Sequence, residues 1–211
     1  MPTSAQESIS ATFAQVEQTG MKLAIKGRIV AIVLMGIWLI ASRPADRAGE
    51  FITVLSVLAL IGLLHYAVIG SGVDRPWVKY VFITIDIAIF CLAVILSDAF
   101  PSADLPQVMI FRFDVFQYYF IILAVAAFSF STGMLIWSGF VGAAGWMAAY
   151  AWLSHNIPNR QNWTDLPANP TQEQFYAFFF NPDFAPIGSR FQEALTFIVV
   201  AVLIAIVMRR A

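Results

Sequence analysis

Six apolar segments, each about as long as a bilayer is thick, constrain what this chain can fold into. A membrane-spanning helix needs about 20 mostly apolar residues, and charged side chains near its ends can reach the headgroups. Turn-forming stretches such as SRPADRAGE, SGVDRP and SFSTG separate the segments. The sequence therefore predicts an all-α polytopic membrane protein, a bundle of six transmembrane helices. The expected spans are residues 22–41, 51–70, 77–96, 111–130, 133–153 and 191–208.

Composition supports this class and excludes others. Hydrophobic residues make up 60% of the 211 residues and charged residues 12%, against roughly 45–50% and about 25% in soluble domains. The net charge of −1 gives no basic surface, so nucleic acid is not an expected partner. The lipid bilayer is the expected one.

The orientation follows from Lys and Arg near the span ends, which gather on the cytoplasmic side. With the N-terminus inside, the inner face holds seven of them and the outer face five, so we expect both termini to be cytoplasmic. The first span is the weakest, and it crosses only if Lys26 and Arg28 sit at the headgroups. The inner set is Lys22, Lys26, Arg28, Arg75, Lys79, Arg209 and Arg210, and the outer set is Arg43, Arg47, Arg112, Arg160 and Arg190.

Two segments outside the spans carry apolar patterns of their own. Residues 1–21 place Ile9, Phe13 and Val16 at helical spacing, which fits either an amphipathic helix on the inner face or a frayed tail. The outer loop 154–189 has five prolines and the cluster FYAFFF. A loop this long is functional or disordered. We expect either a structured cap or ligand lid, or an anchor in the membrane interface.

Asp86 is the ionisable residue nearest the middle of a predicted span. A lone carboxylate at that depth is expected to be protonated, or bonded to a Ser, Thr, Tyr or Trp of a neighbouring helix. Intramembrane carboxylates carry protons or switch packing in many membrane proteins. Asp86 is thus either an intramembrane switch or a polar contact that holds helices together.

Other polar residues near the outer face form a second set of candidates. They could line a pocket for an outer ligand or a small cation, or they could only anchor helices at the interface. The two histidines, His65 and His155, fall on opposite faces of the predicted topology, so one chain cannot bridge a haem or metal between them. The outer candidates are Asp98, Asp104, Arg112, Asp114, Tyr118 and His155.

Small residues in the fifth span form one narrow stripe, Ser138, Gly142, Gly145 and Ala149. Such stripes let helices approach closely, so this span is expected to be an interior helix or a dimer contact. No phosphate-binding loop, HExxH, nucleophile elbow or CxxC is found in the sequence. The chain therefore shows no catalytic set and gives no assignment of a metal.

The order of the segments resembles the six-helix membrane domain at the N-terminus of bacterial class III adenylate cyclases. The likeness runs from MKLAIKGRIVAIVLMGIWLI through YVFITIDIAIFCLAVIL, FRFDVFQYYFIILAVAAFSFS and LIWSGFVGAAGWMAAYAWL to the terminal VMRRA. It covers essentially the whole chain, but it rests on order and span length and contains no diagnostic motif.

The resemblance implies a homodimeric membrane anchor, with a sensor role, for a cytoplasmic domain that follows residue 211. That domain would convert ATP to cyclic AMP and pyrophosphate, and the Mg²⁺ or Mn²⁺ ions of the reaction would bind there. This chain itself would carry no cofactor. Residues 209–211, with Arg209 and Arg210, would then begin the linker to the output domain.

Three alternatives remain open at this stage. A six-helix sensor of this kind can precede a histidine kinase or a diguanylate cyclase. A small proton or cation transporter would use Asp86, although all prolines lie outside the expected spans and the halves show no convincing repeat. The chain could also be a purely structural anchor.

Overall fold

A computed structural model of the chain describes residues 4–42, 45–96, 107–155 and 157–210, and their secondary structure is helical apart from one isolated β-bridge. The all-α prediction is confirmed. Six long helices make up most of the molecule, and four short ones lie before α4 and between α5 and α7. The long helices are α1 (Ser4–Ser42), α2 (Ala45–Val68), α3 (Val78–Leu96), α4 (Gln117–Phe128), α5 (Thr132–Ser154) and α7 (Ile187–Arg210). The short ones are η1 (Gln107–Arg112), η2 (Asp114–Phe116), η3 (Trp163–Asp165) and α6 (Gln172–Phe179).

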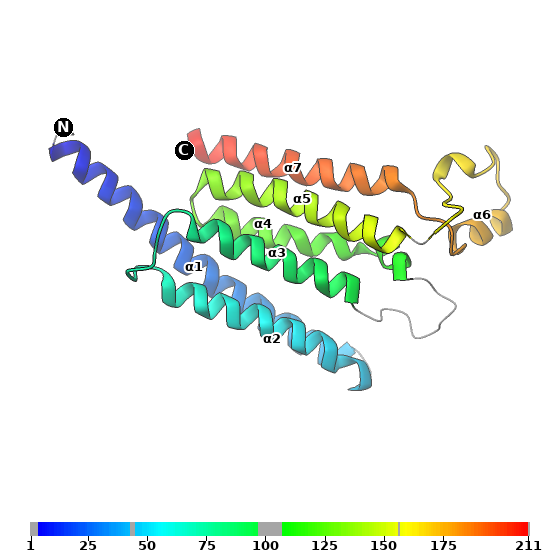
Figure 1. Ribbon diagram of the computed structural model, residues 1–211, viewed down its shortest axis with the longest axis horizontal. Helices are drawn as coiled ribbons and strands as arrows, with labels where there is room; N and C mark the ends of the chain where they lie inside the picture. The colour runs from blue at the N-terminus through cyan, green and yellow to red at the C-terminus, as the bar shows by residue number, and fades with distance from the viewer. Residues whose placement is uncertain (1–3, 43–44, 97–106, 156, 211) are drawn as a thin grey trace.

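The helices form two groups that run side by side (Figure 1). Helices α3, α4, α5 and α7 make a bundle, in which α5 packs most extensively against α7 and next against α3. Helices α1 and α2 form a hairpin beside it, where α1 contacts α4 and α2 contacts α3. The start of α1 and the end of α7 lie at the same end of the molecule, and the segment with α6 projects from the other.

Three helices among the described residues are long and apolar enough to cross a membrane. They are α3, α5 and α7. Two shorter apolar stretches, Ile52–Val68 within α2 and Gln117–Phe128 (α4), fall below the length of a span. The sequence therefore predicted the apolar helical character correctly, while the six-span count stays a prediction.

The fourth expected span begins differently from the prediction. Its first residues fold as the 3-10 helices η1 and η2, and the α-helix starts only at Gln117. Phe111 and Phe116 are buried, and both rings pack against Trp146 of α5. We attribute the break to this aromatic packing, because an uninterrupted α-helix would place the two phenylalanine rings at a different spacing along the helix.

Helix α1 is continuous from Ser4 to Ser42, so the predicted boundary between residues 1–21 and 22–41 is not a break in the helix. Met21, Ala24, Ile25 and Arg28 are all buried. The last three lie three, four and seven residues after Met21, which places all four on one face of the helix. That face, with a charged residue at its end, is the one directed at the rest of the molecule.

The small-residue stripe of α5 lies inside the bundle. A Cβ atom added to Gly142 would come within 2.5 Å of the Phe197 ring of α7, and one added to Gly145 within 2.8 Å of Cys91 Sγ of α3. Ser138 and Ala149 on the same stripe are also buried. The stripe therefore serves packing within the chain, between α5 and its two neighbours.

We predict that Gly142→Leu destabilises the fold by about 1–3 kcal/mol, because the added side chain must displace the Phe197 ring from a filled core. Gly27→Ala is the matched control, since a Cβ at this mid-helix glycine of α1 meets no atom within 4 Å. It should be neutral or slightly stabilising. Thermal unfolding in detergent measures both, and equal midpoints for the two variants would contradict this packing.

Candidate functional site

A buried ion pair joins the α1–α2 hairpin to the bundle. Arg28 of α1 is 9% exposed and Asp86 of α3 is 5% exposed. The guanidinium donates to both carboxylate oxygens, Nη1 to Oδ2 and Nη2 to Oδ1, the second at 2.8 Å. Nη2 also donates to the carbonyl oxygen of Leu58 in α2, at 2.6 Å. One side chain thus connects α1, α2 and α3.

This arrangement corrects one prediction. Asp86 is not a lone carboxylate bonded to a neutral hydroxyl or indole, because its partner is a charged arginine. Arg28 lies on the same helical face as Met21, Ala24 and Ile25 and points inward with them, while its position at the headgroups stays a prediction. In this bidentate contact, the arginine and the carboxylate neutralise each other's charge through two hydrogen bonds.

His65 completes a polar centre beside the pair. It lies in the last turn of α2, is 5% exposed, and stacks on Phe82 of α3 with ring centroids 4.1 Å apart. His65, Arg28 and Asp86 line one small cavity together with Ser129. We call Arg28, His65 and Asp86 the polar centre. His155 follows α5 at the opposite end of the bundle.

The main interaction in the polar centre is the Arg28–Asp86 ion pair. Both oxygens of Asp86 are engaged by Arg28, so transfer of a proton to Asp86 would require that contact to open. No group of three or more His, Cys, Asp or Glu side chains that could hold a metal occurs in the part of the chain that the structure describes. The centre is therefore suited to fixing helix positions, or to switching them when the pair separates.

We predict that Asp86→Asn lowers the free energy of unfolding by about 3–5 kcal/mol, since it leaves the Arg28 charge buried without its partner. Glu17→Gln is the control: it removes a similar partner from Lys79 at a more exposed position, with the Glu17 side chain 34% exposed, so water can solvate the charge left behind and the loss should be smaller. Denaturant titration in detergent gives both values. A loss for Asp86→Asn no larger than that for Glu17→Gln would refute the role assigned to the pair.

At the other end of the bundle, residues 157–186 fold into a cap. Arg112 of η1 holds it, because its guanidinium donates to the carbonyl oxygens of Phe179, Asn181 and Phe184, the second at 2.8 Å. The guanidinium also lies over the Phe184 ring, 5.2 Å from its centroid. These contacts give hydrogen-bond donors to carbonyl groups at the C-terminal end of α6, where the last carbonyls have no partner within the helix and a positive charge is favoured.

The cap has its own internal structure. The Gln161 backbone accepts from Ala185 at 3.1 Å and donates to Asp183 at 2.8 Å. Phe184 is fully buried, with the Trp163 ring packed edge-on at 4.8 Å. Thr171 begins α6 with a capping box. The loop is therefore folded, while its role as a ligand lid or as an anchor in the membrane interface stays a prediction.

Further hydrogen bonds connect the cap and its surroundings to α5 and α7. Tyr150 donates to the carbonyl of Ala185, and Trp163 donates to Ser189 Oγ at 3.0 Å. Arg190 of α7 donates to the carbonyl of Phe111 and pairs with Glu193 at 2.8 Å. The N-terminal end of α7 is therefore held by both η1 and the cap.

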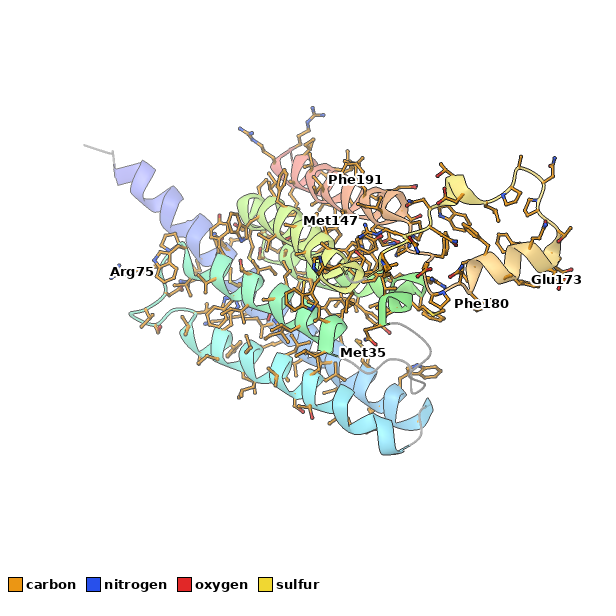
Figure 2. All side chains as sticks on the ribbon, turned by 45° about the vertical axis from the view of Figure 1, so that its right-hand side comes forward. Met35, Arg75, Met147, Glu173, Phe180 and Phe191 are labelled. Atoms are coloured by element: carbon orange, nitrogen blue, oxygen red, sulfur yellow. The ribbon has the colours of Figure 1, made fainter. Side chains whose placement is uncertain are left out.

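The cap leaves aromatic side chains exposed on α6 and just after it: Phe175, Tyr176 and Phe180. Figure 2 shows Phe180 and Glu173 on the projecting segment, far from Arg75 at the other end of the molecule. Because these rings are exposed, they can contact a membrane surface.

The predicted outer-face candidates do not assemble into one described site. Asp98 and Asp104 lie outside the described residues, as does the side chain of Asp114. Arg112 faces backbone carbonyls of the cap. Tyr118 is exposed beside Phe90, with centroids 6.1 Å apart, and His155 is exposed. The cation pocket built from carboxylates therefore remains a prediction.

Contacts at the end of the molecule opposite the cap were not foreseen from the sequence. Lys79 of α3 donates to Glu17 of α1 and, at 3.0 Å, to Ser131 Oγ. Gly20 of α1 sits against the α4–α5 turn, where an added Cβ would lie 2.7 Å from the Phe128 carbonyl oxygen. Arg209 and Arg210 are exposed at the end of α7. The only clue in the sequence was the glycine within an otherwise helical stretch.

We predict that Arg112→Ala releases the cap. Hydrogen exchange of the backbone amides in residues 161–185 should become several-fold faster, because the carbonyls that receive the guanidinium lose their partner. Arg75→Ala, an exposed arginine at the other end, should leave the exchange unchanged. Unaltered protection of residues 161–185 in Arg112→Ala would show that Arg112 does not hold the cap.

No family model, curated protein or solved structure matches this chain. The resemblance to the membrane domain of adenylate cyclases therefore stays a prediction made from the sequence.

Proposed function

We propose that this chain is the membrane anchor and sensor domain of a signalling protein, whose cytoplasmic output domain follows residue 211. In this proposal it is a six-span bundle in a bacterial inner membrane, with both termini in the cytoplasm. It works as a homodimer that sets the spacing of two output domains. The output suggested by the sequence resemblance is a class III adenylate cyclase, which makes cyclic AMP and pyrophosphate from ATP.

The observation that carries this proposal is the placement of α7. It is one apolar helix that begins beside the folded cap and ends at Arg209 and Arg210. Its first turn is tied to η1 through Arg190 and to the cap through Ser189. A displacement of the cap would thus act directly on the helix that leads to the proposed output, as in other helix-shift switches.

The polar centre supplies the second element that such a sensor needs. Two packings of a bundle can be biased only if some contact differs between them. The Arg28–Asp86 pair is a buried charged contact between the hairpin and the bundle, so a packing that moves the hairpin away from α3 would have to break it. The same pairing disfavours the transporter alternative, since Asp86 already has a fixed counter-charge.

The direct test joins this chain at Ala211 to the catalytic domain of a class III cyclase that is active only as a dimer. We predict that membranes of a cyclase-deficient bacterium carrying the fusion make cyclic AMP well above those carrying the soluble catalytic domain alone. Dimerisation by the membrane domain raises the local concentration of the catalytic domains. Cyclic AMP in the membrane fraction is the measurement.

Two controls separate sensing from simple anchoring. A fusion to one inert transmembrane helix controls for membrane attachment, and Arg112→Ala in the fusion tests whether the cap influences output. If the original fusion, the single-helix fusion and the Arg112→Ala fusion all made equal amounts of cyclic AMP, this chain would act only as a membrane anchor. No cyclic AMP above the soluble domain would count against the proposal as a whole.

A further inference from the structure

The His65 ring is buried and lacks a hydrogen-bond partner among the described residues. It is 5% exposed, and one face of the ring is covered by Phe82. A neutral imidazole has one donor and one acceptor nitrogen at its edge. Buried polar groups are nearly always satisfied, and where no protein group serves, an ordered water does.

The cavity beside His65 has the size and lining that a water requires. Its volume is about 10 Å³, close to the least volume that one water needs. Four of its ten lining residues carry polar side chains, those of Arg28, His65, Asp86 and Ser129, and the other six are apolar. An empty cavity of this size would be expected only with an apolar lining.

The polar groups around the cavity retain bonding capacity. Arg28 uses three of its five N–H groups on Asp86 and Leu58. Each Asp86 oxygen accepts one bond from Arg28, which leaves further lone pairs. Ser129 Oγ donates to the Ala126 carbonyl at 2.6 Å and accepts from the Ser131 amide at 3.3 Å, which leaves one acceptor site on the hydroxyl.

We propose that this cavity binds one water molecule, which hydrogen-bonds to His65 and to the Arg28–Asp86 pair. The water extends the ion pair into a network over α1, α2, α3 and the α4–α5 turn. The inference is independent of the proposed function, because it follows from burial, cavity size and hydrogen-bonding capacity alone.

Radiolytic hydroxyl labelling of the intact chain in detergent tests the site, because ionising a bound water oxidises the side chains around it even when they are buried. Met134 and Met21 line the cavity. Met109 in η1 is not among the lining residues and is the matched control, 3% exposed against 2% for Met134. We expect Met134 and Met21 to be oxidised several-fold faster than Met109. Equal rates would overturn the proposal.

Substitutions test whether the water responsible for the labelling lies at the polar centre. His65→Phe removes the polar edge, and labelling of Met134 should fall to the rate of Met109. His155→Phe, at an exposed histidine, should change nothing. If His65→Phe does not fold, Ala24→Val narrows the cavity from α1 and should have the same effect. Fast Met134 labelling that persists in a folded variant of either kind would place its source outside this site and refute the assignment.

Discussion

A buried bidentate ion pair, Arg28 with Asp86, fixes the α1–α2 hairpin against the bundle. Among the described residues the hairpin has few other charged contacts with the bundle, and near the end of α1 it exposes apolar residues such as Leu34, Ile37 and Trp38. Without a hydrophobic driving force between helices in lipid, position must come from close packing and polar contacts. Inside the bundle, glycines of α5 provide the close packing. Between the hairpin and the bundle, the ion pair provides the polar contact, and Glu17 with Lys79 adds a second one at the end of the bundle opposite the cap.

This division gives the molecule one tightly packed part and one part held by fewer contacts. Helices α5 and α7 approach so closely that a single added methyl group at Gly139 would meet Ala201 at 2.6 Å. Because a packed core does not deform gradually, a shift is more readily accommodated where the hairpin meets α3 and α4. The cap, held through Arg112 and Tyr150, lies on the tightly packed part. In the proposed sensor, the hairpin would therefore be the part able to change its position relative to the bundle.

Much of this architecture could be read from the sequence, and the gaps have physical reasons. The apolar runs predicted the ends of α3 and α5 to within one residue and those of α2 and α7 to within six, because length and hydropathy are local properties. The start of α4 was missed because the break depends on aromatic rings of α5. Asp86 and Arg112 were identified as notable residues, but their partners were not. Arg28 is 58 residues from Asp86, and backbone carbonyls that bind Arg112 leave no trace in a sequence. The spacing of Met21, Ala24, Ile25 and Arg28 was the one available signal that Arg28 points inward.

The most direct test of the central claim is a double-mutant cycle with Arg28→Met, Asp86→Leu and the double variant, using free energies of unfolding in detergent. If the pair fixes the hairpin, each single variant leaves a buried charge or carboxyl without its partner, while the double variant restores an apolar contact. We predict a coupling free energy of about 2–3 kcal/mol between the two positions. Additive effects, within about 0.5 kcal/mol, would show that Arg28 and Asp86 act independently and would contradict this account.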